Sequence, residues 1–172
     1  EKDKKRIPDI DTLLKDGQEL KIGNLNVKTI FIPGHTSGHI AFYFEKEKVV
    51  FTGDTLFSLG CGRVFEGTYQ QMFESLNKIK SLPGDTKIYC GHEYTKNNLG
   101  FCIKFNPNNK YLKYKEKMLE AKIKDGKPTI PSTIKEEIQT NIFLRYNDVD
   151  VKDALNLKNA SDLEVFTKLR DL

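Results

Sequence analysis

The stretch FIPGHTSGHIAFYF, residues 31–44, decides how the chain folds around its histidines. It places His35 and His39, two of the three histidines, four residues apart. A helix would bring side chains at this spacing onto one face, but the proline and two glycines between the apolar runs disfavour a helix. The run IAFYF that follows is rich in β-branched and aromatic residues, which favour strands. We therefore expect a loop between two strands, with both histidines in the loop.

Composition indicates a globular protein of one ordinary domain or two small ones. The 172 residues are 38% hydrophobic and 30% charged, and they are enough to bury a substantial core. Lys and Arg exceed Asp and Glu by four (28 against 24), and the excess is scattered apart from KDKKR near the start. We therefore expect no nucleic-acid partner, whereas a small anionic substrate fits the balance. No apolar run approaches the about 20 residues that a membrane span needs, so we expect no membrane partner.

The cysteines indicate the redox compartment. Cys61, Cys90 and Cys102 are odd in number and do not have the spacing of a metal finger. This pattern favours a reducing compartment over a disulfide framework. We expect a cytoplasmic protein, with targeting to an organelle left open.

Residues 18 to 93 have the pattern of short strands and turns. QELKIGNLNVKTIFIPG, HIAFYFEKEKVVFTGD and KIYCGHEY predict strands, with a tight hairpin at KEK. One helix interrupts them from Thr68 to Leu82, where apolar residues recur at spacings of three and four. Thr68 is a suitable N-cap, and Pro83 with Gly84 ends the helix.

After about Asn106 the pattern becomes helical. The stretch up to Gly126 aligns Tyr111, Tyr114, Met118 and Ala121 along one stripe, which we expect to pack in the core. A second helix begins at Ser132 or Thr133, and a third is capped by Ser161, with Glu164 three residues later. We therefore expect an α/β protein with two parts, residues 1–105 and 106–172.

Chemistry-bearing side chains follow three of the predicted strands. His35 and His39 follow TIFIPG, Asp54 follows VVFTG and His92 follows KIYCG. Strand ends fix the position of a side chain while the loop leaves it accessible, and imidazole with carboxylate suits zinc, iron or manganese. Each residue alone could be an ordinary loop residue, and TGD alone could be a turn. Together they predict a metal site.

These motifs resemble a known family. PGHTSGH, FTGDTLF and YCGHEYT, in this order, resemble the later metal motifs of the metallo-β-lactamase superfamily. GCGRVFEGT, GHEYTKNNLGF, NIFLR and EVFTKLRDL are similar to the hydroxyacylglutathione hydrolases, the glyoxalase II family. The resemblance implies the C-terminal part of an αββα sandwich over residues 1–105, followed by a helical substrate-binding domain over residues 106–172.

The resemblance also implies two divalent metal ions, zinc first, with iron or manganese as alternatives. His35 would bind one metal, His92 the other, and Asp54 would bridge both. His39 would support the loop instead of binding metal. The implied activity is hydrolysis of S-D-lactoylglutathione and related 2-hydroxyacyl glutathione thioesters by a metal-activated hydroxide. The cysteines would pack as small apolar residues, with Cys61 close to the site.

Substrate-binding residues follow from the same resemblance. Arg63, Tyr94 and Arg170 match positions that bind glutathione, and a guanidinium can hold a carboxylate through two parallel hydrogen bonds. Phe65 stands where many members have a tyrosine, so we expect one hydroxyl contact to be absent.

One expected motif has no match. The family's first metal motif, THxHxDH, does not occur, and three histidines cannot replace it. We expect the chain to be a piece of a longer, monomeric parent enzyme, inactive by itself and with an uncovered apolar sheet face. Two alternatives stay open: a persulfide dioxygenase of the same superfamily that uses one iron, and a non-catalytic module whose helical tail binds a partner.

Overall fold

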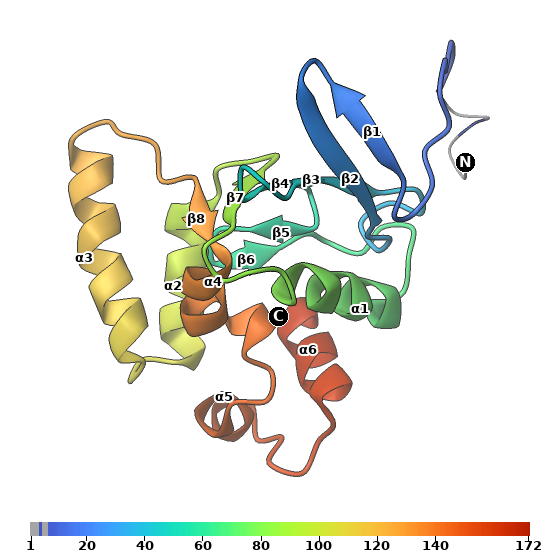
Figure 1. The fold of residues 1–172 in the computed structure, drawn as a ribbon. Helices are drawn as coiled ribbons and strands as arrows, with labels where there is room; N and C mark the ends of the chain where they lie inside the picture. Colours follow the sequence, from blue (N-terminus) through green and yellow to red (C-terminus); the bar gives the residue numbers. More distant parts are fainter. Residues whose placement is uncertain (1–3, 5–6) are drawn as a thin grey trace.

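A computed structural model describes residue 4 and residues 7–172 of the chain. Its main element is a six-stranded mixed sheet (Figure 1). In spatial order the sheet contains β1 (Glu19–Ile22), β2 (Leu25–Phe31), β3 (Ile40–Phe44), β4 (Val49–Gly53), β7 (Lys87–Cys90) and β8 (Ser132–Thr133), while β5 (Leu56–Phe57) and β6 (Gly60–Cys61) form a separate small hairpin. Neighbouring strands are antiparallel except β4 and β7, which are parallel.

Helices lie between the later strands and after the last one along the chain, which confirms the α/β class. They are α1 (Tyr69–Lys80), α2 (Thr95–Phe105), α3 (Lys110–Lys124), α4 (Ile134–Thr140), a 3-10 turn (Ile142–Leu144), α5 (Val149–Ala154) and α6 (Asp162–Asp171). Figure 1 shows α1, α4 and α6 on the same side of the sheet. Among the described residues, no helix combines the length and apolar character needed to cross a membrane.

The two faces of the sheet have different surroundings because side chains alternate along a strand. Tyr43 and Val50, which pair across β3 and β4, are buried in the core that α1 completes through Met72, Leu76 and Ile79. On the opposite face Phe51 stacks on the Tyr89 ring and is 45% exposed. This exposed side chain is consistent with the expected uncovered apolar face.

Local signals in the sequence locate several helix ends correctly. Thr68 caps α1 and forms a capping box with Gln71, and Ser161 caps α6 in the same way with Glu164. Thr133 is the N-cap of α4, so the predicted start at Ser132 or Thr133 is confirmed. The hairpin predicted at KEK joins β3 to β4.

The prediction for α3 chose the wrong face, and α2 was not expected. Tyr111 and Tyr114 are 45% and 73% exposed, whereas Leu112, Lys115 and Leu119 are buried. The prediction failed because Lys115 lies on the buried face, and a charged residue in the sequence indicates an exposed position. The stripe of Tyr111 and Tyr114 therefore faces outward, contrary to the expectation. The helix α2 escaped prediction because its polar start, TKNN, gives little hydrophobic periodicity.

Candidate metal centre and substrate pocket

Three strand ends bring His35, Asp54 and His92 to one edge of the sheet. The strands β2 and β4 are both antiparallel to β3, and β7 is parallel to β4, so all three run in the same direction. Their carboxyl ends therefore meet at one edge, where α/β proteins commonly place their sites. Each residue lies in the loop that follows its strand.

The Asp54 carboxylate faces a different imidazole with each oxygen. Its Oδ2 lies 3.6 Å from Nε2 of His35, and its Oδ1 lies 3.4 Å from Nε2 of His92. Oδ1 is buried and has no hydrogen-bond partner among the described residues. Buried polar atoms normally have partners, so an orphaned carboxylate oxygen between two imidazoles fits a bridging metal ligand.

The His35 ring is oriented by backbone. Its Nδ1 lies 2.9 Å from the carbonyl oxygen of Arg63. A carbonyl can only accept, so Nδ1 carries the proton and Nε2 presents its lone pair toward Asp54. Such a second hydrogen bond is the usual support of a metal-binding histidine.

His39 has a different role, because its Nε2 is already engaged. It accepts the backbone N–H of Asp54 at 3.1 Å. Gly53 allows this approach: its φ is +51°, and a Cβ there would lie 2.5 Å from Nε2 of His39. His39 therefore braces the backbone at Asp54, in agreement with the expected supporting role.

A cavity of about 560 Å³ opens beside these residues. The cavity is lined by all seven site residues predicted from the sequence: His35, Asp54, Arg63, Phe65, His92, Tyr94 and Arg170. The five other lining residues are Phe57, Cys61, Gly62, Asn97 and Asn98. Residues distant in the chain, from loops and from α2 and α6, thus meet around one space.

The two arginines of the cavity differ in how they are held. Arg63 is exposed, and its side chain makes no hydrogen bond or ion pair to another described residue. Arg170 donates from Nη1 to the carbonyl oxygen of Cys61 at 3.1 Å and lies 5.2 Å from the ring centre of Phe143. Because a guanidinium has five N–H donors, this contact leaves Arg170 able to bind a carboxylate.

Aromatic rings flank His35 and His92. Tyr94 stacks on His92 with ring centres 5.1 Å apart, and Phe57 packs edge-on against both. On the other side the Phe65 ring lies 5.0 Å from the His35 ring. The two imidazoles thus lie between apolar surfaces.

Two of the cysteines, Cys61 and Cys102, are buried thiols. Burial raises the pKa of Cys61 to about 11 and that of Cys102 to about 12, so both are thiols at neutral pH. Cys61 lines the cavity, as expected.

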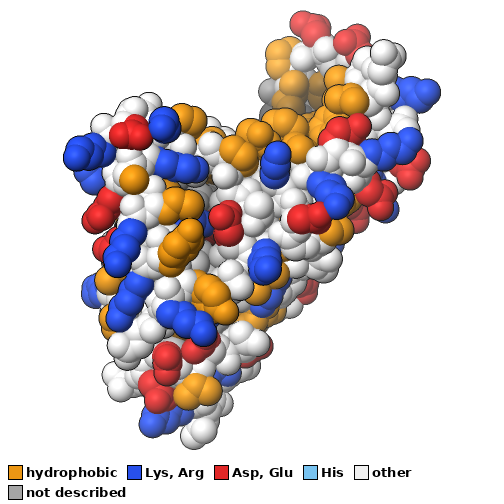
Figure 2. Space-filling view, turned by 60° about the vertical axis from the view of Figure 1, so that its left-hand side comes forward, with side chains coloured by type: hydrophobic (Ala, Val, Ile, Leu, Met, Phe, Trp, Pro, Cys, Tyr) orange, Lys and Arg blue, Asp and Glu red, His pale blue; other side chains and the backbone are white. Residues whose placement is uncertain are grey.

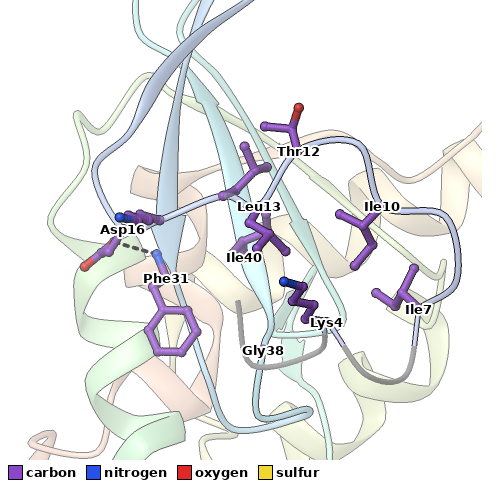
Figure 3. Close-up of a pocket in the computed structure, with 11 residues that line it drawn as sticks. Lys4, Ile7, Ile10, Thr12, Leu13, Asp16, Phe31, Gly38 and Ile40 are labelled. Carbon is purple, nitrogen blue, oxygen red and sulfur yellow. Dashed lines mark hydrogen bonds between the residues drawn. The ribbon is translucent and has the colours of Figure 1, made fainter.

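A second cavity, of about 580 Å³, lies between the segment before β1 and strands β2 and β3. Figure 3 shows its apolar lining, with Ile7, Ile10, Leu13 and Ile40 around the space and Asp16 bonded to the Phe31 backbone. It lacks the histidines and arginines of the first cavity. The two cavities are similar in volume and differ in the chemical character of the residues that line them.

Two features of the site escaped the sequence analysis. Gly62 is a close-approach position, because a Cβ there would lie 1.9 Å from the carbonyl oxygen of Asp54. Glu93 accepts the backbone N–H of Thr129 and so ties the loop after His92 to the segment before β8. Neither has a sequence signal beyond its place inside a quoted motif.

Both parts of the chain match known protein families. Residues 2–92 match the family model of the metallo-β-lactamase superfamily, and residues 93–172 match that of the hydroxyacylglutathione hydrolase C-terminus. The hydroxyacylglutathione hydrolase of Pelagibacter ubique (strain HTCC1062) is 55% identical over 170 residues, which are 99% of this chain and 65% of the relative. The chain thus spans about two thirds of the length of that relative.

Solved structures show the same fold. ETHE1 from Myxococcus xanthus has a TM-score of 0.57 and 24% identity, over 92% of this chain and 50% of that one. TTHA1623, solved in a di-iron-bound form, has a TM-score of 0.50 and 25% identity, over 76% of this chain and 47% of that one. The metallo-β-lactamase fold expected from the motifs is therefore confirmed. The chain belongs to the metallo-β-lactamase superfamily, and its sequence places it with the hydroxyacylglutathione hydrolases of that superfamily.

Proposed function

We propose that this chain carries part of the metal site and the glutathione pocket of a hydroxyacylglutathione hydrolase. The whole enzyme would hydrolyse S-D-lactoylglutathione and related 2-hydroxyacyl glutathione thioesters to glutathione and the free acid. The observation that carries the proposal is the Asp54 carboxylate, whose two oxygens face His35 and His92 separately and whose Oδ1 has no hydrogen-bond partner among the described residues.

His35, Asp54 and His92 fit two divalent metal ions, one imidazole to each and the carboxylate shared. Zinc suits this donor set best, and iron or manganese are alternatives. When bound, such ions supply Lewis acidity, which activates water and polarises a carbonyl. The described residues contain no compact group of three or more potential ligands. One imidazole and a shared carboxylate leave each metal short of the usual four ligands, so we propose that further ligands complete the site.

The other residues of the cavity would bind and orient the substrate. Arg63 and Arg170 would hold glutathione carboxylates, and Tyr94 would offer its hydroxyl beside His92. Phe57 and Phe65 would exclude water from the thioester. A thiolate leaves without a strong general acid, since a thiol has a pKa of about 8.5, and the structure correspondingly needs no acid beside the leaving group.

The test joins this chain to the part of the Pelagibacter ubique relative that it does not cover. We expect the fused protein to bind two metal ions and to hydrolyse S-D-lactoylglutathione at about 1–10³ s⁻¹, measured by loss of the thioester and release of free thiol. We expect the 172-residue chain alone to show no such turnover. A folded, metal-loaded fusion without hydrolysis would overturn the proposal, and oxygen consumption with glutathione persulfide in its place would favour the dioxygenase alternative.

A cytoplasmic location and a monomeric enzyme are also proposals. The space-filling view in Figure 2 shows Lys and Arg side chains interspersed with Asp and Glu on that face. Sedimentation of the fused protein would test the monomer, and fluorescence microscopy of the tagged whole protein would test the location.

A further inference from the structure

The carboxylate of Glu137, on α4, is buried beneath the turn between β5 and β6. Its side chain is fully buried, as is most of Lys115 on α3, whose Nζ donates to Oε1 at 2.7 Å. The backbone N–H of Leu59 in the turn donates to Oε2 at 2.7 Å. The Asn141 amide, one helical turn further on, donates to the same oxygen at 3.0 Å. Two helices outside the sheet thus meet the turn at one carboxylate.

The turn needs such support because its backbone is strained. Leu59 has a φ of +62°, in the left-handed region that side chains other than glycine disfavour. The neighbouring carbonyl groups are also bound by helix side chains: Asn98 donates to Ser58 at 3.0 Å and Asn141 donates to Gly60 at 3.0 Å. Several contacts therefore fix one conformation of the turn.

The position of the turn is passed on to the metal-facing residues. The strand β6 leads into Gly62, whose N–H donates to the carbonyl oxygen of Thr55 at 3.1 Å and which has no room for a Cβ beside Asp54. The next carbonyl, that of Arg63, accepts from Nδ1 of His35 at 2.9 Å. Arg63 is only four positions after Leu59, and the contacts of Gly60 and Gly62 fix the backbone between them.

We propose that Glu137, paired with Lys115, is a positioning residue for the metal site. It fixes the β5–β6 turn and, through the Arg63 carbonyl, holds His35 with its proton on Nδ1 and its Nε2 directed at the metal position. The inference deepens the proposed function, on which it rests only for the assignment of His35 as a metal ligand. A buried ion pair is weak evidence for stability, because apolar residues of similar volume often replace it without loss. Its contact with the turn supplies the specific role.

Three variants of the 172-residue chain separate positioning from stability. The double variant Lys115→Met with Glu137→Leu removes both charges and the acceptor for Leu59 while keeping most of the volume. Lys115→Met with Glu137→Gln removes the charges but keeps a carbonyl oxygen that can accept from Leu59. Lys80→Met is the matched control, since the Lys80 ammonium is half-buried against Leu144 and Tyr146 and, among the described residues, makes no hydrogen bond to Glu137 or to the β5–β6 turn itself.

The first readout is the tautomer of each histidine, from long-range ¹H–¹⁵N NMR of the metal-free chain at a pH where the imidazoles are neutral. We expect His35 to be held as the Nδ1–H form in the unmodified chain, to become a tautomer mixture in the leucine variant, and to be intermediate in the glutamine variant. His39, held by the Asp54 N–H, should not change in either. The second readout is the Zn²⁺ affinity of the same variants in the fused protein, by competition with a chromophoric chelator, which should fall about 10- to 100-fold in the leucine variant.

The outcomes separate the two proposals. An unchanged His35 tautomer in a folded leucine variant, or an equal change in Lys80→Met, would overturn the positioning role. If only the glutamine variant folds, a change at His35 without one at His39 supports the role, and no change refutes it. Failure of the folded fused protein to bind Zn²⁺ would count against His35 as a ligand, whereas normal Zn²⁺ binding with no hydrolysis by the fused protein would count against the proposed function alone.

Discussion

The two walls of the cavity around His35, Asp54 and His92 are built in different ways. On the metal-facing wall, the His35 ring is oriented by the Arg63 carbonyl at 2.9 Å, and the Asp54 backbone is held at 3.1 Å by His39, which lies outside the cavity lining. On the substrate-facing wall, Phe65 and Tyr94 are 68% and 48% exposed, and Arg63 is exposed as well. Backbone contacts thus hold the His35 and Asp54 part of the first wall before any ligand arrives, whereas His92 is 52% exposed and the second wall can adjust to a ligand. Changes to the first should therefore alter metal binding and kcat, and changes to the second should mainly alter KM.

The largest effect is expected from Asp54→Asn in the fused enzyme. An amide replaces one carboxylate oxygen with a donor and removes the charge, so one metal loses its shared ligand. We expect metal content to fall and kcat/KM to drop by about 10³-fold or more, equivalent to about 4 kcal/mol. Elemental analysis and steady-state kinetics would measure both. Asp85→Asn, at an exposed carboxylate paired with Lys48, is the control, and full activity in Asp54→Asn would show that this carboxylate does not bridge.

The second effect is steric and tests how tightly the metal-facing wall is packed. Gly62→Ala would place a Cβ 1.9 Å from the Asp54 carbonyl oxygen and 3.0 Å from the carbonyl carbon, and neither backbone atom can move aside cheaply. We expect a loss of about 2–3 kcal/mol in the free energy of unfolding, which lowers Tm by about 4–12 °C.

Gly100→Ala provides the matched control for this comparison. Gly100 lies within α2, and a Cβ there would meet nothing within 4 Å. Alanine favours a helix over glycine, so we expect a gain of about 0.5–1 kcal/mol. Equal Tm values for the two variants in thermal unfolding would contradict the close approach at Gly62.

Much of the metal-facing wall could be predicted because its signals are local. His35, Asp54 and His92 each follow an apolar strand pattern, and parallel strand directions then bring their ends together. The capping boxes at Thr68 and Ser161 are local in the same sense, since each depends on a residue three positions away. The motifs also assigned Arg63 and Arg170 to substrate binding, and both line the same cavity although they are 107 positions apart in the chain (170 − 63).

The features that could not be predicted from the sequence depend on contacts between segments distant in the chain. The crowding at Gly62 arises from the carbonyl of Asp54, and no periodicity reports it. Lys115 and Glu137 carry charges, so a pattern of apolar residues assigns both to the surface. Their burial is possible only because each neutralises the other when α3 packs on α4. The wrong face predicted for α3 has this same cause.

The third effect concerns the substrate-facing wall. Arg63→Ala should raise KM for the glutathione thioester about tenfold with little change in kcat or Tm. The Arg63 guanidinium has no partner among the described residues, so its removal takes away a contact with the substrate and none within the protein. Arg170→Ala should raise KM and also lower Tm, since this side chain also bonds the Cys61 carbonyl and lies over Phe143. Steady-state kinetics and thermal unfolding of both fused variants would distinguish them, and a fall in kcat alone for Arg63→Ala would place that residue in the chemical step.

The smallest effect is expected from Phe65→Tyr, which adds a hydroxyl to the exposed rim of the cavity. The ring already lies 5.0 Å from that of His35, so the backbone and the metal-facing side chains need not move. If the hydroxyl meets glutathione, KM should fall about threefold at constant kcat, as one exposed hydrogen bond provides. Phe65→Leu keeps an apolar side chain without a ring and controls for packing against His35. The opposite result would be an unchanged KM in the tyrosine variant together with the expected rise in KM for Arg63→Ala. It would place glutathione nearer to Arg63 and Tyr94 than to Phe65, so that only the part of the wall with Arg63 and Tyr94 adjusts to the substrate.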